Sequence, residues 1–257
     1  MKFGNNESHL NEHYGTGRFQ RRIRLVNTPD RVLCELEDCS HGFKVDVVHS
    51  EGQITELAPQ VIRHPLSTCG GAVEPLKKFI GLSTGQTTID YYSQVKPKLN
   101  CTHLYDLTAL GATHAGRDEQ ERLYDIIVPD ELDGGTTITI QLNGKTIFEW
   151  QVSEWAMAAP EHLKGKPLHS GFLHWVLREY EDDQEMLACA LMAQKAYLVS
   201  QARRFNKAMG EGKSAASNPA MQGACYSYQP GVIEGATFLS SFRDFTGVEE
   251  QLLKFEA

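Results

Sequence analysis

The 257-residue chain lacks the segments that mark membrane, secreted and nucleic-acid-binding proteins. No stretch approaches the roughly 18 to 20 consecutive apolar residues that span a bilayer. The polar segment 1–17 has no apolar core of a secretory signal. The formal net charge of −8 predicts a surface that repels phosphate backbones. We therefore expect a cytoplasmic protein with neither a membrane nor a nucleic-acid partner.

The chain also lacks several short motifs of cofactor-dependent enzymes and metal sites. It has no Gly-x-Gly-x-x-Gly after a predicted strand, no P-loop and no Cys-x-x-Cys pair. Its six cysteines are irregularly spaced and follow no signal peptide, so we expect buried, catalytic or metal-bound cysteines rather than disulfides. They are Cys34, Cys39, Cys69, Cys101, Cys189 and Cys225.

Alternating apolar residues predict a meander of three or four antiparallel strands near the N-terminus. In a strand, every second side chain faces the same side, so each alternating set joins one face. Turn signals at 28–30, 39–42 and 50–52 separate the runs. The alternating positions are Ile23 and Leu25, then Val32, Cys34 and Leu36, then Phe43, Val45 and Val47.

Two short helices are expected after the meander. Ser67 or Thr68 can cap the first helix, which Gly81 ends, and Asn100 can cap the second. Their apolar positions are Val73, Leu76, Phe79 and Ile80 in the first and Leu104, Leu107 and Leu110 in the second.

A second β-hairpin layer and a long C-terminal helix follow in the prediction. Asn143-Gly144 suits a type I′ turn, because both residues tolerate positive φ. Asp182 with Glu185 resembles a capping box at the start of the long helix. The predicted strands are 123–128, 137–142 and 145–152, and the predicted helices are 171–179 and 182–205.

These patterns predict an α+β protein with one main domain. We expect a flexible leader at 1–17 and a single α+β domain at 18–205. Segment 206–224 is rich in Gly, Ser, Ala and Asn and is expected to be a linker or lid. Segment 225–257 is expected to pack on the core.

Cys69 and Cys101 are the most informative pair for chemistry. Each is predicted in the first turn of a helix, where unpaired N–H groups and the positive end of the dipole favour a thiolate. A thiolate can attack a substrate or bind a metal. The alternative is that each is a small buried apolar residue, since free cysteine is often buried.

Asp38, His41 and His103 extend this pair to a possible metal site. Asp38-x-x-His41 lies in a strand connection and can supply an oxygen and a nitrogen ligand, or a general base with its orienting carboxylate. A plain turn, with the histidine in solvent, is the alternative. With Cys69 and Cys101, these residues have the ligand types of zinc or iron. His64, Tyr226 and Tyr228 are expected to line a substrate pocket.

These motifs resemble those of a bacterial domain-of-unknown-function family, family 2889. The resemblance covers roughly residues 21–230 and implies no activity, because the family name carries none. The matching motifs are Asp38-Cys39-Ser40-His41, Cys69, Cys101-Thr102-His103-Leu104, Tyr124-Asp125, Glu149-Trp150, Gly171-Phe172 and Cys225-Tyr226.

A more distant resemblance is to NifU-type iron–sulfur scaffold proteins. They also place strands first and then a cysteine at each of two helix starts, which Cys69 and Cys101 match in order. Cys39 corresponds to the remaining scaffold cysteine, although its spacing differs. A large hairpin and a long helix follow here that scaffolds lack. The resemblance implies a NifU-like core without implying cluster assembly.

Two functions from different classes follow from these observations. The first is an enzyme of the lyase, decarboxylase or hydrolase type that acts on a small aromatic or acyl compound. Its catalytic residues would be His41, Cys69 and His103, assisted by zinc or iron or by a thiolate. The second is a non-enzymatic metal or iron–sulfur carrier. We favour the enzyme, because a small carrier does not need segment 118–230. We also expect a homo-oligomer formed through the long helix.

Overall fold

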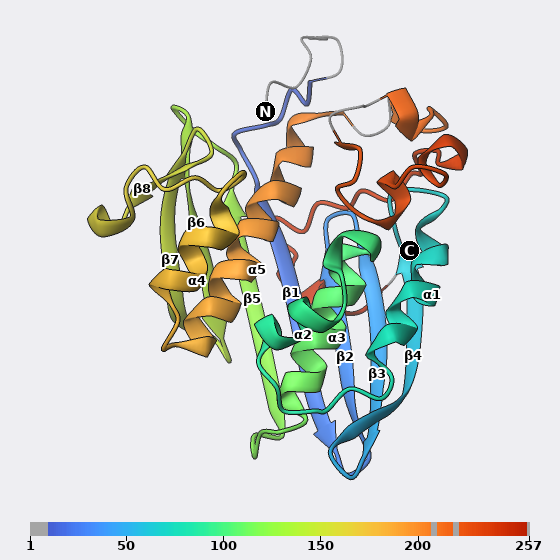
Figure 1. Ribbon diagram of the computed structural model, residues 1–257. Helices are drawn as coiled ribbons and strands as arrows, with labels where there is room; N and C mark the ends of the chain where they lie inside the picture. The colour runs from blue at the N-terminus through green and yellow to red at the C-terminus, as the bar shows by residue number, and fades with distance from the viewer. Residues whose placement is uncertain (1–9, 207–209, 218–220, 256–257) are drawn as a thin grey trace.

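The computed structural model describes residues 10–206, 210–217 and 221–255. Its centre is one eight-stranded antiparallel sheet, with the strand order β4-β3-β2-β1-β5-β6-β7-β8 (Figure 1). The strands are β1 (Arg18–Thr28), β2 (Arg31–Asp38), β3 (Gly42–Ser50), β4 (Gln53–Arg63), β5 (Glu121–Pro129), β6 (Gly135–Leu142), β7 (Lys145–Ser153) and β8 (Ala156–Ala159).

The predicted N-terminal meander is confirmed and has four strands. β1 pairs with β2 so that Ile23 lies opposite Leu36, and β2 pairs with β3 so that Cys34 lies opposite Val45. These alternating side chains are buried, as the period of two requires. The connection between β2 and β3 brings Asp38 and His41 to one end of the sheet.

The predicted second β layer is wrong. β5 pairs with the free edge of β1, with Tyr124 opposite Ile23, so the later strands extend the same sheet. An unpaired edge leaves N–H and C=O groups without partners, and β5 satisfies those of β1. The Asn143-Gly144 turn is confirmed, with φ of 51° and 79° at the two residues.

The helices that cover the sheet lie on one of its faces (Figure 1). α3 contacts β1, β2 and β3, while α5 contacts β5 and β6. Gly111 permits the close approach of α3, because a Cβ there would lie 2.3 Å from the sulfur of Cys34. The α-helices are α1 (Val73–Leu76), α2 (Thr88–Gln94), α3 (Thr102–His114), α4 (Phe172–Glu179) and α5 (Gln184–Ser200).

The first predicted helix is present as a run of short turns, and a third helix was not foreseen. η2 (Cys69–Ala72), α1 and η3 (Lys77–Phe79) follow one another without a break. α2 was missed, although Thr87 and Asp90 form a capping box at its start. None of the helices in the described part of the chain is long and apolar enough to cross a membrane.

Two predicted helix caps are wrong by one residue. Cys101, not Asn100, is the N-cap of α3. Asp183, not Asp182, caps α5, because its carboxylate accepts from the N–H of Met186 at 3.0 Å. The long helix continues beyond α5 as η6 (Gln201–Arg204).

The chain after α5 packs against the body of the protein where the structure describes it. In the predicted linker, Ala215 is buried and its N–H donates to the carbonyl of Ala236. Farther on, the N–H of Arg243 donates to the carbonyl of Cys39 at 2.7 Å. The last residues therefore lie beside the connection between β2 and β3.

Candidate functional site

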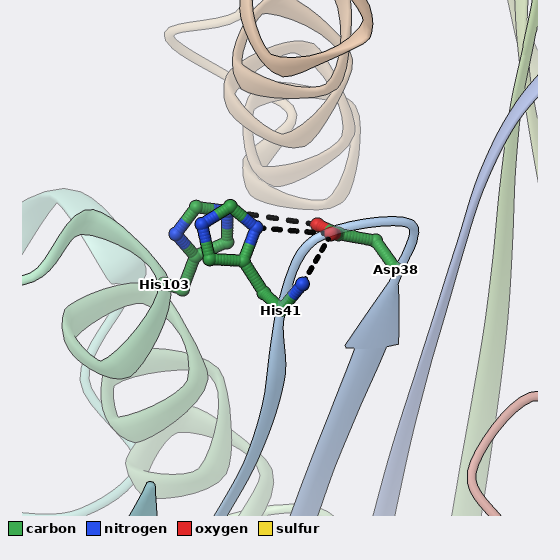
Figure 2. A group of neighbouring side chains, drawn as sticks. All are labelled: Asp38, His41 and His103. Atoms are coloured by element: carbon green, nitrogen blue, oxygen red, sulfur yellow. Dashed lines mark hydrogen bonds and ion pairs between the residues drawn. The ribbon is translucent and has the colours of Figure 1, made fainter. Parts of the chain in front are cut away.

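Three buried or nearly buried side chains meet where β2, β3 and α3 converge. Asp38 ends β2, His41 lies in the connection to β3, and His103 lies in the first turn of α3. Each residue has a potential metal-ligand atom that lies within 4.8 Å of the corresponding atoms of the other two. Figure 2 shows both imidazoles directed toward the Asp38 carboxylate. The structure thus brings together three of the five predicted metal ligands.

The Asp38 carboxylate organises the connection that carries His41. Its Oδ1 accepts from the backbone N–H groups of Ser40 and His41, each at 2.9 Å. The same oxygen lies 2.9 Å from Nδ1 of His41. The expected turn and the expected Asp–His pair are therefore both present, since one carboxylate shapes the loop and orients the ring.

Arg21 completes the group and was not predicted. Its Nε and Nη2 donate to Oδ2 of Asp38 at 3.0 and 2.7 Å, and Nη2 also lies 2.8 Å from Nε2 of His103. A guanidinium can only donate, so Nε2 of His103 accepts and the neutral ring carries its proton on Nδ1. A hairpin register drawn on the sequence would have found Arg21, because it lies opposite Asp38.

The rings of His41 and His103 stack on each other. Protonation of both rings would place two positive charges in contact and is therefore disfavoured. The ring centroids lie 3.7 Å apart. Burial lowers the pKa of His103 well below its usual value, and the charge of Arg21 and that of a protonated His41 act in the same direction. Burial opposes ionisation of Asp38, but His41 and Arg21 nevertheless hold the pKa of this carboxyl well below its usual range. The group therefore combines an anionic Asp38 with a neutral His103.

A second buried ion pair supports the same end of the sheet. Glu37 is fully buried and accepts from Nη2 of Arg63 at 2.9 Å. The same guanidinium group donates to the carbonyl of Asp38 at 2.6 Å. Glu37 also accepts from the N–H of Leu253 at 2.7 Å, which ties the C-terminal segment to β2. These bonds hold the Asp38 backbone in place.

Cys69 and Cys101 lie outside the group that Asp38, His41 and His103 form. The hydroxyl of Ser227 donates to the sulfur of Cys69 at 3.4 Å, and the N–H of Tyr226 donates to the carbonyl of Asn100 at 2.9 Å. In the described residues, neither cysteine belongs to the group of three ligands.

The cysteines in this neighbourhood favour the protonated thiol. Burial raises the pKa of Cys69 and of Cys101, and it raises the pKa of Cys225 to about 11. The expectation that helix ends would favour thiolates at Cys69 and Cys101 is therefore wrong, because desolvation of the sulfur outweighs the dipole.

The three predicted pocket residues make defined contacts near Cys69. Nδ1 of His64 bonds to the carbonyl of Leu66 at 2.9 Å. Tyr226 lies against Gly71, where an added Cβ would come within 2.4 Å of the tyrosine hydroxyl. Tyr228 packs in a small core cluster with Leu66 and Cys69. Their role as a substrate pocket stays a prediction.

One further stretch has the letters of a hydrolase motif without its structure. Gly81-Leu82-Ser83-Thr84-Gly85 reads Gly-x-Ser-x-Gly. It follows η3, and its serine forms an isolated bridge with Gln53. The hydrolase elbow requires a strand that turns sharply into a helix, so Ser83 is not a nucleophile of that type.

Comparisons with known proteins leave the site to be interpreted from its own geometry. No protein-family model matches the chain, and no curated protein sequence matches it.

Proposed function

We propose that this chain is an enzyme that acts on a small molecule at Asp38, His41 and His103, with zinc or iron held by these three side chains. The observation that carries the proposal is the convergence of a carboxylate and two imidazoles from β2, its loop and α3. Two histidines with one carboxylate suit zinc and ferrous iron. Such an ion polarises a carbonyl or lowers the pKa of bound water.

Arg21 is the main test of whether an ion fits. Its Nη2 lies between Oδ2 of Asp38 and Nε2 of His103, at 2.7 and 2.8 Å, and donates to both. Oδ2 of Asp38 and Nε2 of His103 also carry the lone pairs that a metal would require. The positively charged Arg21 side chain binds both acceptors. A metal ion that displaced it would keep a positive charge beside Asp38. Metal binding therefore requires Arg21 to release His103.

The chemistry of the group supports the proposed reaction type. The anionic Asp38 fixes His41, and the neutral His103 keeps a lone pair at Nε2. A buried position strengthens both interactions, because water does not screen them. A lyase, decarboxylase or hydrolase that acts on a small aromatic or acyl compound uses a polarised carbonyl and a nearby base.

Metal content is the first experiment. Protein purified without chelators and incubated anaerobically with zinc or ferrous iron should bind about one ion per chain. His41→Ala and His103→Ala should lose it, and the exposed His174→Ala should retain it. Equal metal content in all four proteins, or none in any, would refute the metal centre.

A metal-free mechanism is the second candidate, favoured by the bond between Nδ1 of His41 and Oδ1 of Asp38. The ionised carboxylate accepts the Nδ1 proton, which leaves Nε2 of His41 as a general base. Hydrolysis of small esters should distinguish the candidates. Turnover that survives a chelator but is lost in His41→Gln supports the metal-free dyad, whereas turnover lost with the chelator and restored by zinc supports the metal.

The carrier hypothesis depends on the cysteines. Cys69 and Cys225 lie close enough to Cys101 that their ionised forms would raise its pKa further, so the three thiols occupy one neighbourhood. Anaerobic reconstitution with iron and sulfide tests this hypothesis. Visible absorption that Cys69→Ser abolishes would favour a carrier, and a colourless product would count against it.

A further inference from the structure

A cavity of about 200 Å³ lies at the C-terminal end of α3. Its lining comes from the end of α3, from β5, from the first turns of α5 and from the loop before α2. The step along α3 from His103 to His114 corresponds to about 16 Å. The cavity is therefore separate from the Asp38 group.

Two buried polar side chains on this lining have unused hydrogen-bonding atoms. His114 is 1% exposed, and neither of its ring nitrogens makes a hydrogen bond of good geometry, although the backbone of Gln120 approaches the ring. Arg122 is 4% exposed, and its Nε has no partner. Buried polar atoms are normally satisfied in folded proteins, so these atoms leave bonding capacity for water or for a ligand in the cavity that their residues line.

The charges on the lining favour an anion. Glu185 accepts from Nη2 of Arg117 at 3.0 Å, from Nη2 of Arg122 at 2.9 Å and from the hydroxyl of Tyr124 at 3.1 Å. Two guanidinium groups thus face a single carboxylate on the lining. Glu119 lies 3.4 Å from Nη1 of Arg122, but its side chain is 58% exposed and outside the lining. The two guanidinium groups are thus matched by two carboxylates, but solvent screens the charge of the exposed Glu119, so the potential inside the cavity stays positive.

The size and the remaining lining restrict the anion further. The volume corresponds to about six or seven water molecules, which is below the range of drug-sized pockets. Leu25, Leu110 and Ala188 supply apolar surface beside the polar groups. A short apolar chain with one carboxylate matches this combination better than a fully hydrated inorganic ion.

We propose that this cavity binds a small organic monocarboxylate, a site distinct from the proposed catalytic group. The carboxylate accepts from Arg122 and from the ring N–H of His114, and the short chain packs on Leu25, Leu110 and Ala188. A neutral imidazole also has one acceptor nitrogen. A hydroxyl group on the bound acid donates to this acceptor nitrogen. A 2-hydroxy acid therefore supplies a partner for each of the two ring nitrogens of His114.

Binding of propionate and 2-hydroxypropionate to the full chain tests the proposal by calorimetry, with inorganic phosphate as a third probe. Both acids should bind saturably at millimolar concentration, and the hydroxy acid should bind more tightly. Ala188→Met fills the cavity from α5 without removing a polar group, and His114→Leu removes the unpaired ring. Each should weaken binding by about tenfold or more.

Matched substitutions at exposed positions serve as controls. Ala216→Met and His174→Leu should bind both acids as the unmodified chain does. Circular dichroism of each variant separates lost binding from lost folding. The proposal is overturned if neither acid saturates the protein, if folded Ala188→Met and His114→Leu bind normally, or if phosphate alone binds.

Discussion

The two ends of α3 carry histidines in opposite states. At the N-terminal end, His103 accepts from Arg21 and stacks on His41. At the C-terminal end, His114 is as buried as a core residue, but neither of its nitrogens makes a hydrogen bond of good geometry and only the backbone of Gln120 approaches the ring. The same helix thus presents one histidine within a closed network and another that faces a cavity.

This difference shows how to distinguish structural networks from ligand sites. A buried polar group that is fully paired contributes to stability, and its loss leaves a partner unsatisfied. An unpaired buried group weakens the free protein and is retained where a ligand can complete it. The ends of α3 should therefore respond in opposite ways to the same substitution.

The largest effect is expected at Asp38, which holds the N-terminal network together. Asp38→Ala leaves the buried Arg21 guanidinium without its carboxylate, and the loss of one partner of a buried pair costs about 3 to 5 kcal/mol. Urea unfolding should show this decrease in the free energy of unfolding. The exposed Asp182→Ala is the control. A loss below about 1 kcal/mol would mean that the network behaves like a surface pair.

His103→Leu should have the next largest effect. The leucine cannot accept from Nη2 of Arg21 or stack on His41, so a buried donor loses its partner. We expect the free energy of unfolding to fall by about 1 to 3 kcal/mol. Urea midpoints at neutral pH measure it, and an unchanged midpoint would show that the bond from Arg21 to His103 contributes nothing.

Acid should destabilise the metal-free protein through both histidines. Burial lowers the pKa of His103 strongly and lowers that of His114. An unfolded histidine binds a proton near pH 6.5, so the unfolded chain binds more protons below that pH. Stability is therefore complete above about pH 6.5 and falls toward the folded pKa, by up to about 1.4 kcal/mol per pH unit for each histidine.

Substitutions show how much the histidine at each end of α3 contributes to the fall of stability with decreasing pH. His103→Leu should flatten the decline of stability between about pH 6.5 and pH 5 more than His114→Leu does. Asp38 adds to the decline only below about pH 3.9, because its folded pKa is also lowered. Equal slopes in the unmodified chain and His103→Leu would contradict this assignment.

Local sequence patterns predicted the elements better than their assembly. Two predictions that depend only on residues close in sequence were confirmed. They are the alternation of Val32, Cys34 and Leu36 and the turn at Asn143-Gly144. The pairing of β5 with β1 joins segments about a hundred residues apart, and periodicity contains no information on such contacts. The short α2 was missed because it has only seven residues and its apolar stripe is brief.

The candidate site was predicted by residue type but not by partner. Asp38, His41 and His103 were named from chemistry, and the structure brings them together. Cys69 and Cys101 were grouped with them because both begin helices, a property that does not fix distance. Arg21 was missed because an arginine in a strand usually faces solvent. His114 lies at the opposite end of α3 from this site.

The smallest expected effect is the most direct test of the comparison. His114→Leu removes an unpaired buried ring from the free protein, so the free energy of unfolding should change by less than about 0.5 kcal/mol or should increase. The same substitution should abolish the stabilisation by added 2-hydroxypropionate, which acts only on chains that bind it. Thermal melts with and without the acid measure both quantities. A loss as large as that of His103→Leu, without added acid, would show that His114 is a paired structural residue, and the two ends of α3 would then be alike.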